Sequence, residues 1–190
     1  MSAATGNAYV FGRHEPASHV LIHVSDPHFL AEGARLGGRY DVEDTFARTL
    51  VAIRAVHPSP AAIVLTSDLT DLGEPDAYRR LRDAVEPVAQ DLGTQVIWVA
   101  GNHDERPAMR RDLLGQAPSL DPISRAFDLD GLRLIPLDSS VPGWHPREIG
   151  ADQLSWLATE PTSPAPLATV PALPPPPLPS PAPLFHSLHL

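Results

Sequence analysis

The sequence predicts an α/β fold in which parallel strands alternate with helices. Three short apolar runs rich in β-branched residues, at 19–24, 61–66 and 95–99, are typical of buried strands. Segments with a helical spacing of apolar residues separate these runs, so that each pair of strands can be joined by a helical crossover. Each run also ends in a polar loop, and in a parallel sheet such loops gather at one edge.

Residues that start and stop helices place the two crossover helices. Asp41 is a candidate N-cap for a periodic segment that reaches Ile53. The second helix is expected to begin near Pro75 and to end before Gly93. Proline is favoured in the first turn of a helix and glycine just past the last turn, so both residues agree with this placement.

The second half of the chain predicts shorter elements. A helix is expected near 106–114, and another over 151–157. Between them, the segment 125–137 holds two apolar runs on either side of the dipeptide Asp130-Gly131, which is a good hairpin turn. We expect this antiparallel pair to join the same sheet as the first three strands.

The composition changes sharply at Pro161. From there to Leu190 no residue is charged and 11 of the 30 residues are proline. Proline removes a helix hydrogen bond, which excludes a transmembrane helix, and it excludes a central strand in the same way. We therefore expect a flexible segment at 1–18, one domain at 19–160 and an extended, polyproline-like tail at 161–190.

Charge and cysteine content exclude several kinds of function. The chain has 14 basic residues, all arginine, against 23 acidic residues, which gives a net charge of −9. This balance argues against binding to a nucleic-acid backbone or to an anionic membrane. The absence of cysteine excludes disulfides, cysteine-bound zinc and a cysteine nucleophile. The N-terminus has no pattern typical of a signal peptide, so we expect a cytoplasmic protein.

Polar side chains follow each of the three predicted strands. They are Asp26 and His28 after the first strand, Asp68 after the second, and Asn102 and His103 after the third. Any one of them alone is more simply a turn or cap residue. Together, at the same edge of a parallel sheet, they favour a shared metal site. Carboxylate and amide oxygens mixed with imidazole nitrogen suit manganese, iron or zinc better than calcium.

Each residue can be given a chemical role. Asp68, on the central strand, is placed to bridge two ions about 3.5–4 Å apart, a spacing that clamps both reacting oxygens of a phosphoester. Asp26 and His28 are expected on one ion and Asn102 on the other. His103 is then placed to protonate the leaving alkoxide, because imidazole changes charge near neutral pH.

Two more aspartates stand close to these residues. Asp71 lies three positions after Asp68, and Asp104 directly follows His103. A carboxylate beside a histidine ligand commonly accepts a hydrogen bond from its other ring nitrogen, so either aspartate is a candidate for orienting a histidine. A simple solvated cap remains the alternative for both.

These motifs resemble those of a known family. The order Asp26-x-His28, Asp68 and Gly101-Asn102-His103-Asp104 resembles the calcineurin-like metallophosphoesterases. The sequence around these motifs, at 23–28, 68–75 and 137–143, is similar to the bacterial class III cyclic-nucleotide phosphodiesterases. The resemblance covers about 19–157. It implies an α/β/β/α sandwich, a dinuclear metal centre, and hydrolysis of the 3′,5′-cyclic phosphate of cAMP to the 5′-monophosphate.

The resemblance also implies roles for individual residues. Asp26, His28 and Asp68 would hold the first ion, and Asp68 and Asn102 the second. His103 would contact the phosphate or the leaving oxygen, with His28 and Asn102 close to the phosphate. The implied cofactors are two divalent or transition-metal ions, Mn²⁺ or iron, with Zn²⁺ as a further candidate. The implied partner is a cyclic nucleotide or another phosphoester, without nucleic acid or membrane, and a homodimer is left open.

The chain departs from the family pattern at three points. Ser67 stands where the family has glycine, and Ala172-Leu173-Pro174-Pro175 stands where it has His-His-Pro-Pro. The family's later Gly-His-x-His motif has no counterpart. The second ion therefore keeps only two candidate ligands, one of them shared, and we expect weaker metal binding and a sandwich incomplete at its C-terminus.

Two other functions remain open at this point. One is a phosphomonoesterase or phosphodiesterase of broad specificity, because the metal loops set the reaction more than the substrate. The other is a catalytically inactive remnant that acts as a binding module for a nucleotide or a partner. Metal content measured together with turnover separates these functions.

Overall fold

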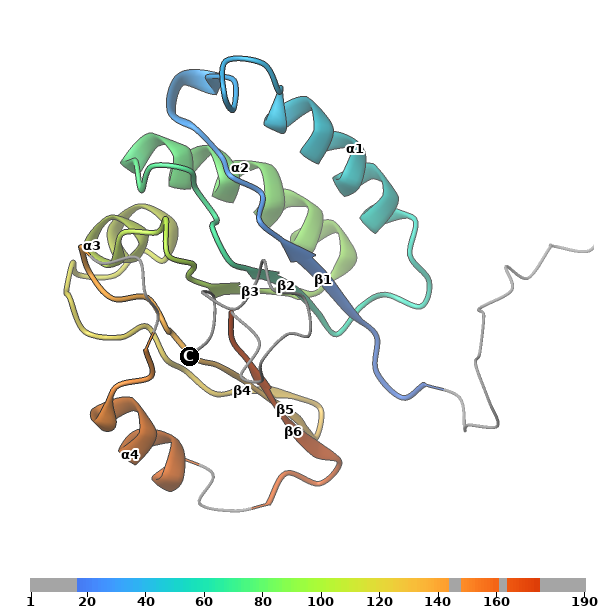
Figure 1. Ribbon diagram of the computed structural model, residues 1–190. Helices are drawn as coiled ribbons and strands as arrows, with labels where there is room; N and C mark the ends of the chain where they lie inside the picture. Colours follow the sequence, from blue (N-terminus) through green and yellow to red (C-terminus); the bar gives the residue numbers. More distant parts are fainter. Residues whose placement is uncertain (1–16, 144–147, 161–163, 175–190) are drawn as a thin grey trace, which may run out of the picture.

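The computed structural model describes residues 17–143, 148–160 and 164–174, which form two three-stranded sheets packed face to face (Figure 1). The first sheet is parallel throughout, in the order β1 (Leu21–Ser25), β2 (Ala62–Thr66) and β3 (Gln95–Val99). The second sheet has β5 at its centre, in the order β4 (Phe127–Leu129), β5 (Leu132–Pro136) and β6 (Ala168–Ala172).

Helices cover the outer sides of the two sheets. Two long helices lie on the outer face of the first sheet (Figure 1): α1 (Val42–Arg54) and α2 (Pro75–Leu92). Two single turns and two short helices complete the described chain: η1 (Ala31–Gly33), α3 (Arg106–Ala108), its π-helical continuation η2 (Met109–Leu113), and α4 (Ala151–Thr159) beyond the second sheet. None of the described helices is both long enough and apolar enough to span a membrane.

The predicted helix ends are confirmed. The Asp41 side chain accepts a hydrogen bond of 3.0 Å from the Asp44 backbone N–H at the start of α1. Helix α2 begins at Pro75 and ends at Leu92, and the next residue, Gly93, closes the last turn in the left-handed conformation with a φ of 64°. Local sequence therefore places both crossover helices.

The core explains why the two sheets stack. Strand β2 is buried on both faces, since its side chains alternate between two apolar clusters. Ile63 and Leu65 face α1 and α2, whereas Val64 faces Leu129 and Leu134 of the second sheet. The expected α/β fold with a two-sheet sandwich is thereby confirmed.

The predicted hairpin forms, but its position differs from the prediction. Phe127 pairs with Leu134 in antiparallel register, as Asp130-Gly131 indicates. The hairpin builds the second sheet instead of extending the first. In this position Leu134 covers the inner faces of β2 and β3. Those faces would stay exposed to water if the hairpin were added in the plane of the first sheet.

Strand β6 lies within the segment expected to be polyproline-like, and that expectation is wrong for Ala168–Ala172. The strand pairs in parallel with β5, with Pro171 opposite Ile135. Proline is tolerated because β6 is an edge strand among the described residues, where the N–H that proline lacks can be one that would face away from the neighbouring strand. The remaining parts of the predicted tail, 161–163 and 175–190, and most of the predicted flexible segment, 1–16, lie outside the described residues.

A buried ion pair joins the second sheet to the start of α3. The Arg106 Nε donates to Asp138 Oδ2 at 2.9 Å, and both side chains are buried. The other guanidinium nitrogens donate to the carbonyl oxygens of Leu120 and Ser140. Arg106 lies directly after the third polar loop, so this pair fixes that loop relative to the hairpin.

Candidate metal centre

The loops that follow β1 and β2 are held together by their backbones. The N–H of Asp26 donates to the Thr66 carbonyl at 3.1 Å, and the N–H of His28 donates to the Asp68 carbonyl at 3.0 Å. The parallel ladder therefore continues past the ends of both strands. It brings the side chains of these loops to the carboxyl edge of the sheet, as the sequence predicts.

Asp26, His28 and Asp68 form a compact group of ligand atoms. One such atom from each residue lies within 4.8 Å of the others, and His28 Nε2 is 3.8 Å from Asp68 Oδ2. Two atoms bound to one ion at about 2.1 Å are at most about 4.2 Å apart, so His28 and Asp68 can share an ion. Two carboxylates and an imidazole fit a divalent transition metal.

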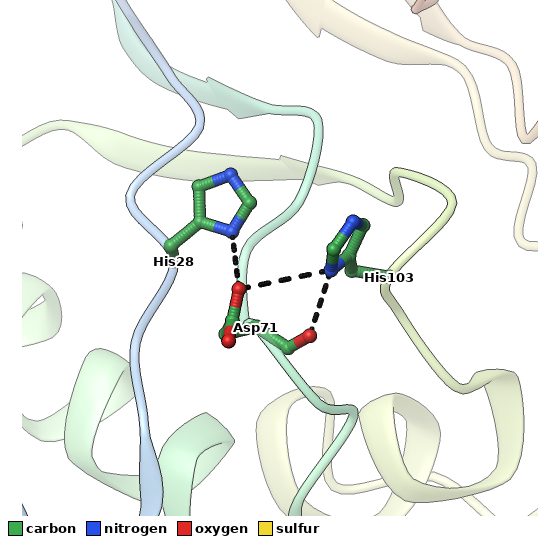
Figure 2. A group of neighbouring side chains, drawn as sticks. All are labelled: His28, Asp71 and His103. Atoms are coloured by element: carbon green, nitrogen blue, oxygen red, sulfur yellow. Dashed lines mark hydrogen bonds and ion pairs between the residues drawn. The ribbon is translucent and has the colours of Figure 1, made fainter. Parts of the chain in front are cut away.

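Asp71 lies between two histidines (Figure 2). His28 Nδ1 is 3.0 Å from Asp71 Oδ1, and His103 Nδ1 is 2.7 Å from the Asp71 backbone oxygen. Both Nδ1 atoms face oxygen acceptors, so each carries the proton of a neutral ring and leaves the Nε2 lone pair free. Each Nε2 points away from Asp71 in Figure 2 and lies 3.8 or 3.9 Å from Asp68 Oδ2.

Asp104 contacts the backbone of two loops instead of a histidine. Its carboxylate accepts hydrogen bonds from the backbone N–H groups of Leu69, Thr70 and Gly101 at 2.8–3.1 Å. Burial raises the pKa of the Asp104 carboxyl to about 6, although these donors act in the opposite direction. Asp104 therefore ties the loop after β2 to the loop after β3.

Tyr78, within the predicted second helix, is a supporting residue that no motif of the sequence assigns to the site. It is fully buried on α2, and its hydroxyl donates to Asp104 Oδ1 and accepts from the Glu105 N–H, each at 2.9 Å. Burial raises the pKa of this hydroxyl far above its ordinary value. A signal was present, because a tyrosine in place of phenylalanine at a buried helix position indicates a partner for its oxygen.

The loops approach one another closely enough to require glycine. A Cβ added to Gly101 would lie 2.0 Å from the Asp68 nitrogen and 2.2 Å from Asp68 Oδ1. The Asp68 carboxylate also accepts a bond from the His103 N–H at 3.2 Å. Asp26, His28 and Ser67 have φ values of 46–60°, which residues other than glycine rarely adopt. Such strain persists where surrounding contacts enforce it, and it is common at functional sites.

Asn102 lies between Gly101 and His103 in the same loop and is half-buried. Among the described residues, Asn102 and Asp68 are the candidate ligands of a second ion. At the end of β6 the described chain offers Ala172, Leu173 and Pro174, whose side chains carry no ligand atom. The structure thus brings together Asp26, His28, Asp68, Asp71 and His103, with Asp104 beneath them as a structural support.

Comparisons with known proteins find similar sequences among phosphodiesterases. A cAMP/cGMP dual specificity phosphodiesterase of Mycobacterium tuberculosis is 48% identical over 88% of this chain and 52% of its own length. A probable cyclic nucleotide phosphodiesterase of Rhodococcus erythropolis is 47% identical, over 85% of this chain and 53% of its own. A 3′,5′-cyclic adenosine monophosphate phosphodiesterase of Pseudomonas aeruginosa is 36% identical, over 74% and 49%.

The chain spans about half the length of the curated relatives that it matches. The model of one family, described as calcineurin-like phosphoesterase, matches residues 19–170, which include all three polar loops, the whole first sheet and the second sheet as far as the middle of β6. The chain belongs to the calcineurin-like phosphoesterase family.

Proposed function

We propose that this chain is a metal-dependent phosphodiesterase whose substrate is a 3′,5′-cyclic nucleotide, converted to the 5′-monophosphate. The observation that carries the proposal is the group formed by Asp26, His28 and Asp68, whose ligand atoms lie within 4.8 Å of one another at one edge of a parallel sheet. The printed names of the relatives support a cyclic nucleotide as the substrate.

The proposed metal ligands follow from the donor atoms. Asp26, His28 and Asp68 would hold the first ion, and Asp68 with Asn102 would hold a second ion more weakly. Manganese or iron suits this set, and zinc is the third candidate. Divalent ions in such a site supply charge stabilisation for the phosphoryl oxygens and lower the pKa of water.

The protein's own residues orient the reacting groups and move a proton. The carbonyl of Asp71 accepts the Nδ1 proton of His103, so Nε2 is the atom that exchanges a proton with the substrate. In its protonated form His103 would donate from Nε2 to the 3′ oxygen as the bond to phosphorus breaks. The carboxylate of Asp71 holds His28 in the tautomer that leaves Nε2 free to bind an ion.

Hydrolysis of cAMP by the purified chain with added Mn²⁺ tests this proposal. Asp68→Ala removes the carboxylate shared by both ions, and we expect turnover to fall more than about 100-fold with loss of bound metal. Asp83→Ala removes an exposed carboxylate on α2 as a matched control and should leave both quantities unchanged. Full turnover in Asp68→Ala would remove the site assignment.

Two alternative functions stay candidates: a phosphoesterase of broad specificity and a binding module without activity. They are favoured by the end of β6, where Ala172 and Leu173 supply no ligand for a second ion. Rates for cAMP, an aryl phosphodiester and an aryl phosphomonoester, measured side by side, separate a cyclic-nucleotide enzyme from a phosphoesterase of broad specificity. Nucleotide binding without turnover or metal would identify a binding module. Cytoplasmic location and homodimer formation stay predictions, which cell fractionation and light scattering test.

A further inference from the structure

An open groove runs from the candidate metal centre along the first helix. Its volume is about 330 Å³, within the range of small-ligand sites. One wall is the end of β1, including Asp26, and the other is the start of α1 with the residues before it, including Tyr40 and Asp41. Asp26 belongs to both the groove and the metal-ligand group, so the groove adjoins the candidate metal centre.

Tyr40 presents an aromatic ring at this groove. The residue as a whole is 59% exposed, although its backbone is fixed by two hydrogen bonds with Leu36, at 2.9 and 3.0 Å. The Arg39 guanidinium lies 5.3 Å from the ring centroid. An aromatic side chain held on a fixed backbone loses little conformational entropy when a flat ligand stacks on it. The core of the protein does not require this ring, because it lies largely in water.

The groove offers a carboxylate to a sugar hydroxyl. Asp26 and Asp41 both line it. Asp26 is a proposed metal ligand, so Asp41 is the lining carboxylate to which a neutral sugar can donate a hydrogen bond. Asp41 is half exposed, and beyond its cap to Asp44 and an ion pair with Arg35 its oxygens retain acceptor capacity. Carboxylates commonly accept bonds from ribose hydroxyls in nucleotide sites.

We propose that this groove is the nucleoside subsite of the candidate metal centre. The base of the cyclic nucleotide stacks on Tyr40, and the 2′-hydroxyl, the only free hydroxyl of a 3′,5′-cyclic ribose phosphate, donates to Asp41. This inference rests on the proposed hydrolysis of cyclic nucleotides and adds the residue that distinguishes a nucleotide from other phosphodiesters.

The test compares two substrates that differ only in the base. With Mn²⁺ present, kcat/KM is measured for cAMP and for methyl ribofuranoside 3′,5′-cyclic phosphate, which carries a methoxy group in place of the base. Because a base stacked on an aromatic ring contributes to the binding free energy, Tyr40→Ala should lower the ratio of kcat/KM for cAMP to that for the methyl riboside about tenfold. The fall should come mainly from a higher KM for cAMP. Tyr40→Phe keeps the ring and should restore the ratio. Val51→Ala, at an exposed position on α1, is the matched control.

Each outcome of this test supports or overturns the subsite. An unchanged ratio in Tyr40→Ala, or an equal fall with both substrates, overturns it, because the ring would then serve the fold or the metal group instead. If the unaltered chain hydrolyses neither substrate, the proposed function fails, and the subsite is judged by calorimetric binding of cAMP. Binding that weakens about tenfold in Tyr40→Ala and recovers in Tyr40→Phe then supports it, and absent or unaltered binding overturns it.

Discussion

The loops after β1, β2 and β3 differ from the segment that follows β6 in how they are held. The first three are joined by backbone hydrogen bonds and by the buried carboxylate of Asp104, which accepts hydrogen bonds from three backbone N–H groups. The described segment after β6 contains only Leu173 and Pro174, and most of the strand before it is exposed. One sheet edge therefore supplies nearly every ligand candidate among the described residues, and an ion bound there depends on the rigidity of that edge.

Gly101 offers the most severe test of that rigidity. In Gly101→Ala the new methyl group would overlap the backbone of Asp68, so the loops after β2 and β3 must separate. We expect the free energy of unfolding to fall by about 3 kcal/mol or more, with loss of metal binding. Gly150→Ala has no atom within 4 Å of its added Cβ and is the control. Urea unfolding and metal titration of both variants provide the measurement.

The buried carboxylate of Asp104 should be visible in the pH dependence of stability. Its pKa rises on folding from 3.8 to about 6, so the folded chain binds more protons than the unfolded chain between these values. Its contribution to stability is complete below about pH 4 and is lost as the pH rises through 6, at most about 3 kcal/mol. Unfolding curves at pH 4–7 with a metal chelator, for the unaltered chain and Asp104→Asn, isolate this slope.

Other carboxylates give a slope of opposite sign, so the comparison with the variant is essential. The Glu32 backbone N–H lowers the pKa of Asp76, whose contribution is lost as the pH falls. Asp76 is unchanged in Asp104→Asn and cancels in the difference. An identical pH slope in the two proteins would show that Asp104 keeps its ordinary pKa in the folded chain.

Tyr78→Phe sharpens the contrast between the two sheet ends. The substitution keeps the buried ring but removes one donor to Asp104 and leaves the Glu105 N–H without its partner. We expect a loss of about 1–3 kcal/mol. Val170→Ala on β6 is 38% exposed and should cost less than about 1 kcal/mol. Chemical unfolding measures both, and a larger cost at Val170 than at Tyr78 would contradict this contrast between the two sheet ends.

Ser67→Gly is the smallest of these effects and the only one expected to stabilise the chain. Ser67 is held at a φ of 60°, where the backbone of a residue other than glycine is strained. Removing the strain should raise the free energy of unfolding by about 1 kcal/mol, reduced in part by the greater freedom of glycine in the unfolded chain. A rise in the thermal midpoint checks this, and a fall would show that the serine side chain contributes contacts that outweigh its strain.

Local chemistry explains why much of the fold was predictable. The Asp41 cap, the Pro75 start and the Asp130-Gly131 turn act over a few residues, so sequence alone places them. The meeting of Asp26 with Asp68 was predictable for a different reason, because the carboxyl ends of neighbouring parallel strands must lie side by side.

The features that sequence did not reveal depend on packing between distant segments. A hairpin can extend a sheet or cover one, and only the apolar inner faces of β2 and β3 decide between them. Pro171 argues against a central strand, but whether a strand lies at an edge depends on the other strands present. A buried tyrosine indicates that its hydroxyl has a partner, but that partner, Asp104, lies 26 positions away along the chain, so local sequence does not identify it.

The bond between Arg106 and Asp138 has a consequence for motion. The Arg106 guanidinium donates hydrogen bonds to one carboxylate and two carbonyl groups. Arg106 directly follows the loop that carries Asn102 and His103. The two halves of the sandwich thus have little freedom to slide past each other near the ligands. A local opening of the hairpin must either break the hydrogen bonds of Arg106 or move the loop of Asn102 and His103 with it. The hydrogen-exchange rates of the two segments should therefore rise and fall together.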